Sequence, residues 1–149
     1  MQNPLKLFIE KLYLSFDDNL VYYDSTTHCK SRFYYDEVIC KEYDKRECKI
    51  AYIDIDNLKR INDAFGHYNG TLHIKNIVSQ LNRLDNVEHI CRVGGDEFIL
   101  VCNTDFNEEP LLNIRGISAG VVRKRAYETW TDAVKRADTE MYKVKKAPK

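Results

Sequence analysis

The sequence predicts an α+β domain, in which an antiparallel-rich sheet has helices packed over one of its faces. Three observations support this fold class. Apolar residues recur every three or four positions in several segments, which is typical of amphipathic helices. Shorter apolar runs of strand length lie between those segments. The pair Gly94-Gly95 separates two such runs, and a glycine pair in that setting favours a β-hairpin.

The elements are expected in the order helix, helix, strand, helix, helix, strand, strand, strand, helix. Residues 4–14 predict a short amphipathic helix whose apolar stripe consists of Leu5, Phe8, Ile9 and Leu12. That stripe either packs on the domain or pairs two chains, and packing within the chain is the favoured interpretation. Residues 31–43 predict a second helix with three inward side chains, Phe33, Val38 and Ile39.

The middle of the chain predicts a buried strand followed by two helices. Residues 48–55 are a short apolar run of the kind found in central strands. Residues 57–65 predict a brief helix. Thr71 is expected to cap a longer helix that runs to Leu84, with one apolar face formed by Ile74, Ile77, Val78 and Leu81.

The last part of the chain predicts the hairpin, one more strand and a final helix. Its apolar runs at residues 88–93 and 98–102 flank the glycine pair, whose tight turn is expected to use positive φ angles. Residues 112–122 predict a further strand, and a helix is expected from Thr131. Because the first crossover is helical, the first strand is expected to pair in parallel with one strand of the hairpin.

Length and composition limit the class of protein. The chain has 149 residues, and residues 1–149 are expected to form a single compact domain with a short N-terminal helix. The 23 basic and 23 acidic side chains cancel, which argues against direct nucleic-acid binding. The apolar runs are too short to span a membrane. The five cysteines lack CxxC spacing, which is typical of reduced thiols in a cytoplasmic protein.

Acidic side chains are expected to meet at one edge of the sheet. Asp54 ends the predicted central strand, at the edge where open sheets bind ligands, and the hairpin carries Asp96 and Glu97. These carboxylates, with the Ile55 carbonyl, are the kind of oxygen ligand that Mg²⁺ prefers. Spacing alone leaves two interpretations equally open: metal-dependent phosphoryl or nucleotidyl transfer, and a solvated acidic turn.

Two long motifs resemble those of the GGDEF nucleotidyl cyclases. The first is Asp54-Ile-Asp-Asn-Leu-Lys-Arg-Ile-Asn-Asp-Ala-Phe-Gly-His67, followed by Gly70, and the second is Arg92-Val-Gly-Gly-Asp-Glu-Phe98. Shorter matches follow the family's order: Ile117-Ser-Ala-Gly120, Ala137-Asp138 and Tyr142-Lys-Val-Lys145, with a weaker one at Asp24-x-x-Thr27 and Arg32. The resemblance covers most of the chain from Asp24 onward. It implies the family's palm/ferredoxin-like fold, an antiparallel-rich sheet with helices packed on it.

The family's typical members are diguanylate cyclases, in which two GTP-loaded subunits meet face to face and form cyclic di-GMP. The resemblance therefore implies a homodimer with Mg²⁺ (or Mn²⁺) as cofactor. It implies that Asp54 and Asp96 bind the metal together with the Ile55 carbonyl. Glu97 would support either the metal or the 3′-hydroxyl, so that the two aspartates and this glutamate form the catalytic set.

The resemblance also implies a nucleotide site. Its phosphate contacts would be Lys59, Lys145 and Lys149, its purine contacts Asn62 and Thr71, and its turn Gly94 and Gly95. Thr71 replaces the family's base-reading aspartate, and a hydroxyl cannot accept both guanine N1–H and N2–H₂ as a carboxylate does. Because losing such a partner costs about 1–3 kcal/mol, guanine preference is expected to relax, and ATP becomes a plausible substrate beside GTP.

Two further departures from the family pattern matter. The RxxD feedback site is absent, because Asp85-Asn-Val-Glu88 occupies that stretch, so product inhibition through it is not expected. Only residues 103–111 separate the hairpin from the next predicted strand, where the family usually carries an additional helix. In this trimmed form the chain also resembles the stand-alone minimal CRISPR polymerases, relatives of the palm domain in the type III CRISPR large subunit that are linked to antiviral defence.

The favoured hypothesis is a Mg²⁺-dependent nucleotidyltransferase that condenses two NTPs into a cyclic dinucleotide second messenger. Its base selection is expected to be relaxed or to favour adenine. The alternative is an ordinary diguanylate cyclase that makes cyclic di-GMP from GTP. An alternative of another class is a non-catalytic nucleotide-binding signalling module, against which the presence of Asp54, Asp96 and Glu97 weighs.

Overall fold

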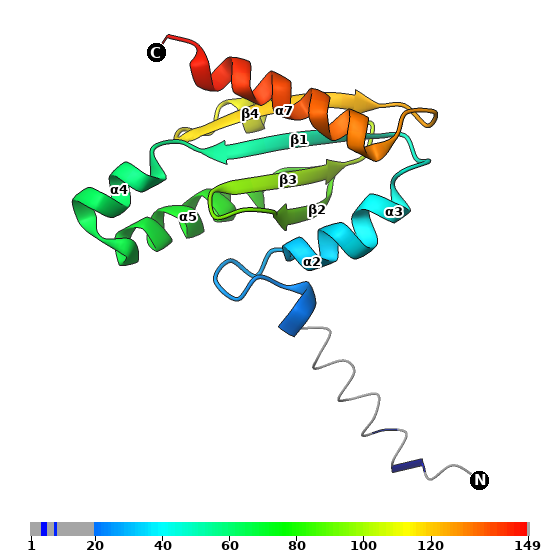
Figure 1. Ribbon diagram of the computed structural model, residues 1–149, viewed down its shortest axis with the longest axis horizontal. Helices are drawn as coiled ribbons and strands as arrows, with labels where there is room; N and C mark the ends of the chain where they lie inside the picture. The colour runs from blue at the N-terminus through cyan, green and yellow to red at the C-terminus, as the bar shows by residue number, and fades with distance from the viewer. Residues whose placement is uncertain (1–3, 6–7, 9–19, 149) are drawn as a thin grey trace.

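The computed structural model describes residues 4–5, 8 and 20–148 of the chain. Four strands form one sheet in the order β2-β3-β1-β4, and every neighbouring pair is antiparallel (Figure 1). The strands are β1 (Cys48–Ile55), β2 (Val87–Arg92), β3 (Glu97–Cys102) and β4 (Ile117–Lys124). The predicted bounds of β1 are confirmed.

The expected parallel pairing of β1 with a hairpin strand is wrong. β1 and β2 do run in the same direction, but β3 lies between them and is antiparallel to both. The helical crossover delivers β2 to the edge of the sheet, and the tight hairpin then folds β3 back into the space next to β1. β1 and β2 are therefore parallel to each other, but they are not hydrogen-bonded neighbours.

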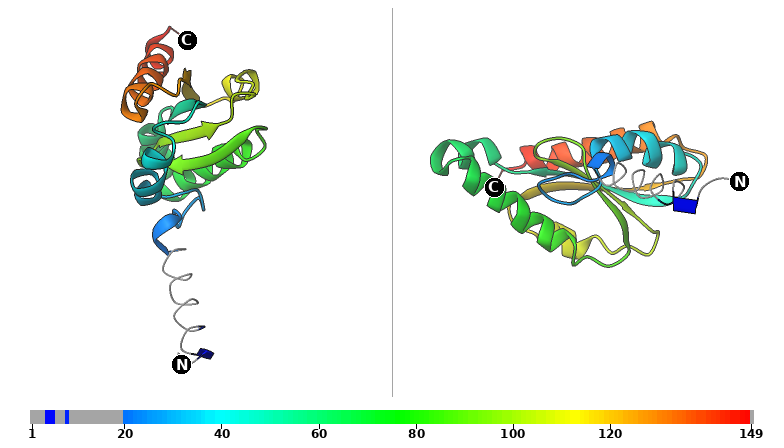
Figure 2. Two further views of the ribbon diagram at one scale, coloured as in Figure 1. Left: turned by 90° about the vertical axis from the view of Figure 1, so that its right-hand side faces the viewer. Right: turned by 90° about the horizontal axis from the view of Figure 1, so that it is seen from below.

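Helices cover both faces of the sheet, whereas one covered face was expected (Figure 2). One face, which carries Ile53 and Leu100, packs against α5 (His67–Leu81). The other, which carries Ile50 and Val101, packs against α7 (Trp130–Lys146) and the segment from α2 (Arg32–Tyr34) to α3 (Cys40–Glu42). Both β1 and β3 are buried at consecutive positions, the pattern of strands that are covered on two sides. The helical elements are α2 (Arg32–Tyr34), η1 (Tyr35–Ile39), α3 (Cys40–Glu42), α4 (Leu58–Phe65), α5 (His67–Leu81), α6 (Glu109–Leu112) and α7 (Trp130–Lys146).

The helix predicted over residues 31–43 corresponds to α2, η1 and α3, of which η1 is a π-helical turn. Ile39 is fully buried as predicted, but Phe33 is 49% exposed, so its inward placement is wrong. Because the wider π turn shifts the angular positions of the side chains, Tyr35 takes the buried place instead. Its hydroxyl accepts a hydrogen bond of 2.9 Å from the indole nitrogen of Trp130.

The two helices after β1 meet at Gly66, whose φ of +86° separates α4 from α5. Helix α5 therefore begins at His67, and Thr71 lies inside it, so the prediction that Thr71 caps this helix is wrong. The predicted buried face is confirmed at Ile74, Ile77, Val78 and Leu81.

The segment after the hairpin also differs from the prediction. Strand β4 begins at Ile117 rather than at residue 112, because the short helix α6, with Pro110 in its first turn, occupies the preceding residues. A helix of one turn thus lies between the hairpin and β4. Helix α7 begins at Trp130, one residue earlier than predicted, because the Thr129 side chain accepts from the Asp132 amide as an N-cap.

Gly120 fixes how closely α7 lies over the sheet. A Cβ added to Gly120 would lie 2.2 Å from the Met141 nitrogen and 2.3 Å from the Ala137 carbonyl oxygen, so the backbones of β4 and α7 touch there. This contact anchors α7 on the sheet, and the last turn of the helix then carries Lys145 to the end of β1.

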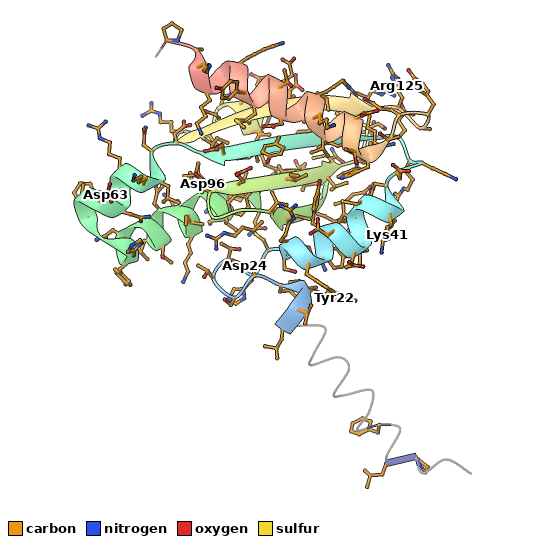
Figure 3. All side chains as sticks on the ribbon, viewed as in Figure 1. Tyr22, Asp24, Lys41, Asp63, Asp96 and Arg125 are labelled. Carbon is orange, nitrogen blue, oxygen red and sulfur yellow. The ribbon has the colours of Figure 1, made fainter. Side chains whose placement is uncertain are left out.

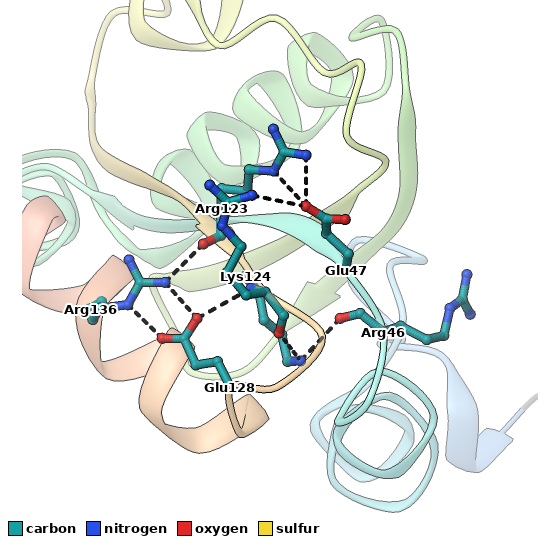
Figure 4. Close-up of polar contacts among 7 residues, drawn as sticks. Arg46, Glu47, Arg123, Lys124, Glu128 and Arg136 are labelled. Carbon is teal, nitrogen blue, oxygen red and sulfur yellow. Dashed lines mark hydrogen bonds and ion pairs between the residues drawn. The ribbon is translucent and has the colours of Figure 1, made fainter.

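A buried lysine closes the opposite end of the sheet (Figure 4). Lys124 is fully buried, and its Nζ donates to the backbone carbonyl oxygens of Asp44 (2.7 Å), Arg46 (3.0 Å) and Arg125 (3.0 Å). Two ion pairs surround it, Arg123 with Glu47 at 2.6 Å and Arg136 with Glu128 at 2.6 Å.

The helix predicted over residues 4–14 lies mostly outside the described residues. Leu5 and Phe8 are described, and they are 64% and 62% exposed, so the favoured packing of these two side chains within the chain is wrong. None of the helices that the structure describes is long and apolar enough to cross a membrane.

Candidate active site

The acidic residues of β1 and of the hairpin come together, as the sequence predicts. Asp54 lies directly opposite Glu97 in the register of β1 and β3. The amide of Ile55 donates to the carbonyl oxygen of Asp96 at 2.8 Å, which ties the end of β1 to the hairpin turn. Figure 3 shows Asp96 at this end of the sheet. Two segments that are distant in the sequence thus bring three acidic residues to one end of the sheet.

The turn itself is built differently from the prediction. Residues 93–96 form the bend, and the amides of Val93 and Gly94 both donate to the Glu97 carbonyl oxygen, at 2.9 and 3.3 Å. The prediction of positive φ angles at Gly94 and Gly95 is wrong, because the glycines with positive φ are Gly66 and Gly116. A Cβ added to Gly95 would meet nothing within 4 Å, so the backbone at the tip is open to an approaching ligand.

Asp54 is the most unusual group of the site. It is only 7% exposed, and its Oδ2 pairs with the Lys145 ammonium at 3.0 Å. Its Oδ1 is buried and has no hydrogen-bond partner among the residues that the structure describes. Burial raises the pKa of Asp54, and the negative charges of Asp96 and Glu97 raise it further against the opposing effect of Lys145. The hydrogen bond to Asp54 raises the pKa of Lys145 in turn.

An unpartnered buried carboxylate oxygen fits a cation ligand, because burying such an atom without a partner is costly. No cluster of three or more His, Cys, Asp or Glu side chains suited to a metal occurs among the residues that the structure describes. Mg²⁺, however, is usually held by one or two carboxylates, with phosphate and water oxygens completing the shell. Asp54 and Asp96 therefore fit a metal that binds together with a nucleotide.

Polar contacts that the sequence analysis missed hold the turn in place. The Tyr52 hydroxyl donates to Glu97 Oε2. Arg92 bridges Asp24 Oδ2 at 3.1 Å and the Gly95 carbonyl oxygen at 2.7 Å, and Arg32 donates to the Val93 carbonyl oxygen at 3.1 Å.

The signals for these contacts were partly available in the sequence. Asp24 and Arg32 belong to the weaker family match in the sequence, which by itself implies no role for either residue. Tyr52 precedes Asp54 by two residues, and strand alternation places both side chains on one face.

The predicted purine contacts lie between α4 and α5. Asn62 packs against Gly70, where an added Cβ would lie 1.7 Å from its Oδ1, so the glycine is needed for this approach. Thr71 is the next residue of α5 and is half-buried. The structure thus brings Asn62 to the turn of helix that carries Thr71.

Of the three lysines predicted to contact phosphates, one lies at the acidic residues of the site, one lies apart from them, and one is outside the described residues. Lys145 reaches the carboxylates. Lys59 lies in the first turn of α4, in an open surface hollow that it shares with Asn57, Arg60 and Asp63, and no contact in the described part of the chain joins it to the acidic residues. Lys149 lies outside the described residues.

Comparison with known proteins shows which family the chain is similar to. The family model for "Diguanylate cyclase, GGDEF domain" matches residues 21–114. Diguanylate cyclase DgcP from Escherichia coli K12 is 39% identical over 119 residues, which cover 65% of this chain and 35% of that protein. The chain spans about a third or less of the length of the curated relatives it matches.

Solved structures agree on the fold. The coiled coil and GGDEF domain of DgcB from Caulobacter crescentus, in complex with c-di-GMP, superposes with a TM-score of 0.81 at 20% identity, over 95% of this chain and 89% of that one. A microbial GGDEF domain studied for its interaction with bis-(3′,5′)-cyclic di-GMP gives a TM-score of 0.70 at 27% identity, over 84% and 93%.

Proposed function

This chain belongs to the GGDEF family of diguanylate cyclase domains, and we propose that it condenses two GTP molecules into cyclic di-GMP. The observation that carries the proposal is the buried Oδ1 of Asp54, which has no hydrogen-bond partner among the described residues and lies at the strand end that is bonded to the Asp96 backbone. Such an oxygen is suited to a metal–nucleotide complex. In the reaction, the 3′-hydroxyl of one GTP attacks the α-phosphorus of the other and pyrophosphate leaves; a second such step closes the ring.

Asp54 and Asp96, with the Ile55 carbonyl, would hold Mg²⁺ (or Mn²⁺). Bound there, the ion would neutralise phosphate charge and lower the barrier for the attacking hydroxyl. Lys145 serves as the counter-cation of Asp54 until the substrate arrives. Its side chain is 45% exposed, so it is free to swing from the carboxylate to the β/γ-phosphates.

The other nucleotide contacts follow from their positions in the fold. Gly95 leaves the tip of the turn open, so the triphosphate approaches the backbone between Val93 and Asp96. Asn62 and Thr71 read the purine edge between α4 and α5. Lys59 at the start of α4 and Lys149 beyond α7 contribute further positive charge to the phosphates.

Base selection is the finer part of the proposal. Several relatives, DgcP from Escherichia coli among them, are named as diguanylate cyclases, which favours GTP and the ordinary cyclase over the minimal CRISPR polymerase hypothesis. Thr71 nevertheless weakens guanine discrimination, because one hydroxyl accepts fewer hydrogen bonds than a carboxylate. A Thr71→Asp variant is expected to raise the preference for GTP over ATP about tenfold.

A homodimer completes the reaction, since one chain offers one nucleotide site and the product joins two nucleotides. Two copies would face each other across their hairpin turns, each holding one GTP. Light scattering with and without a non-hydrolysable GTP analogue tests this: the dimer fraction is expected to rise with the analogue. A monomer at every nucleotide concentration would contradict it.

The decisive test is incubation of the purified protein with Mg²⁺ and GTP, ATP or both, followed by mass spectrometry of the products. Cyclic di-GMP is expected from GTP alone. An Asp96→Ala variant is expected to lose about 10²- to 10³-fold of the rate, because it removes charge at the reacting phosphate. Asp105→Ala, at an exposed turn beyond the other end of β3, is the matched control and should keep full activity.

Two outcomes would contradict the proposal. Absence of a cyclic product in all three mixtures would remove the enzymatic function. If Asp96→Ala preserved a cellular effect of the protein, the non-catalytic nucleotide-binding module would explain that effect better. An adenine-containing product would instead support relaxed base selection.

A further inference from the structure

Glu97 is held by Tyr52, which lies outside the two long motifs that carry the family resemblance. Tyr52 on β1 lies opposite Ile99 of β3, so Glu97, two residues before Ile99, is its diagonal neighbour on the same face of the sheet. The Tyr52 hydroxyl donates to Glu97 Oε2. Asp54 stands on this face as well, directly opposite Glu97.

The contact engages one of the two carboxylate oxygens of Glu97. Oε2 is engaged by Tyr52, and Oε1 lies over the turn, 3.3 Å from the position that a Gly94 Cβ would take. A glutamate side chain has several rotamers, and an unheld carboxylate next to Asp54 and Asp96 would swing away from their charges. We propose that Tyr52 is a positioning residue that holds Glu97 with Oε1 directed at the substrate side of the turn. The inference rests on the proposed function.

A hydroxyl suits this role better than a cation. A lysine or arginine at this place would cancel part of the negative charge with which the site binds a metal–nucleotide complex. A tyrosine orients the carboxylate without adding a charge. Burial raises the pKa of Tyr52, and the hydrogen bond to Glu97 raises it further, so the hydroxyl keeps the proton that it donates.

The chain contains a matched pair for comparison. The Tyr43 hydroxyl donates to Glu88 Oε2, the same chemistry at the opposite end of the sheet, where β2 begins. Burial also raises the pKa of Tyr43. Tyr43→Phe therefore removes the same hydrogen bond without touching the site, and it reports the purely structural cost of such a loss.

The kinetic test compares Tyr52→Phe with Tyr43→Phe. For Tyr52→Phe, kcat is expected to fall about tenfold while KM for GTP changes less than about twofold, because the lost interaction serves the reaction step rather than binding. Tyr43→Phe should leave kcat unchanged. Adding Tyr52→Phe to a Glu97→Gln variant should cause no further loss, since Tyr52 acts through Glu97. Equal kcat values for the two tyrosine variants, or additive losses, would overturn the inference.

A second readout does not depend on activity. In protein labelled with carbon-13 at the glutamate carboxyls, the Glu97 signal, assigned through Glu97→Gln, is expected to move in Tyr52→Phe and to stay fixed in Tyr43→Phe. An unmoved Glu97 signal in Tyr52→Phe would overturn the inference whatever the kinetics. A protein that makes no product from GTP but shows the expected signal shift would overturn the proposed function alone.

Discussion

The two ends of the sheet carry similar groups but satisfy them differently. At the end where β4 stops, Lys124 is fully buried and donates to three backbone carbonyls. At the end where β1 stops, Lys145 has a side chain that is 45% exposed and pairs with one carboxylate, Asp54. The other oxygen of Asp54 has no partner in the described part of the chain. Each end also has a tyrosine that donates to a glutamate.

The difference separates a structural cluster from a binding site. The Lys124 cluster satisfies its buried donor with the chain's own acceptors, so nothing remains for a ligand to complete. At Asp54 the chain leaves an oxygen buried and unsatisfied, and it supplies a cation that is able to leave. An incomplete polar cluster on a rigid strand end is thus the better indicator of function than the presence of charge.

The largest predicted effect on stability is at Lys124, at the end of the sheet where the buried donor is fully hydrogen-bonded. Lys124→Met keeps much of the side-chain volume but leaves three carbonyl oxygens without their donor. Since a lost charged partner of buried acceptors costs about 3 kcal/mol, Tm is expected to fall by roughly 6–12 °C. Calorimetry measures the change. Lys135→Met, on the exposed side of α7, is the control and should leave Tm unchanged.

The enzymatic activity of Lys124→Met tests whether this end of the sheet is purely structural. At a temperature where Lys124→Met is folded, its rate per folded molecule should match the parent protein, because the cluster lies at the far end of the sheet. A Tm within about 1 °C of the parent would mean that the carbonyls find water instead, and that the cluster contributes little to stability.

Lys145→Met is expected to have the intermediate effect, and mainly on function. KM for GTP should rise about tenfold, because a charged phosphate contact is lost. Without nucleotide, Asp54 loses its counter-cation, so Mg²⁺ alone should raise Tm more in the variant than in the parent protein. Thermal melts across a Mg²⁺ series measure this difference without using activity.

Lys143→Met is the matched control for Lys145. Lys143 belongs to the same last turn of α7 and pairs with Glu140 at 2.9 Å, but both side chains are well exposed. It should change neither KM nor the Mg²⁺ response, as expected of a surface pair. If both variants respond to Mg²⁺ alike, general surface charge explains the effect and Lys145 is not a specific partner of Asp54.

The parts of the fold predicted from sequence are those encoded locally. The bounds of β1 and the buried face of α5 follow from apolar periodicity. The meeting of Asp54 with Asp96 joins distant segments, and it is predicted from the place of one residue at a strand end and of the other in the hairpin turn. The errors concern properties that depend on distant parts of the chain. Whether β1 pairs in parallel depends on where the hairpin inserts, and whether one or both faces are covered depends on how every helix packs.

The same limit applies to the site. The sequence indicated which residues would gather, but not which of them pair. The bond between Lys145 and Asp54 joins residues 91 positions apart, so no local pattern predicts it. The hydrogen bond between Tyr52 and Glu97 is partly predictable, because strand alternation puts Tyr52 on the same face as Asp54. Predicting it fully also requires the register of β1 and β3, which the sequence does not give.

The smallest predicted effect concerns Asp24, which supports the turn from outside the sheet. Its Oδ2 accepts from the Thr27 amide, the Thr27 hydroxyl and Arg92, whose other nitrogen holds the Gly95 carbonyl. Although burial raises the pKa of Asp24, the hydrogen bonds from Thr27 and Arg92 outweigh it and hold the pKa below its ordinary value of 3.8. Asp24→Asn keeps the shape but removes the charge, and at pH 7 it should cost about 1 kcal/mol of unfolding free energy.

This cost should depend on pH with a definite sign. A depressed carboxyl pKa stabilises the fold fully above the unfolded value of about 3.8, and the contribution fades as pH falls through the lower folded value. Urea unfolding of both proteins should therefore show the difference at pH 7 and at pH 5, and its progressive loss below pH ~4. Asp105→Asn, at an exposed turn, controls for surface charge. If the difference in unfolding free energy stayed the same in acid, Asp24 would stabilise the fold through packing and not through its ion pair with Arg92.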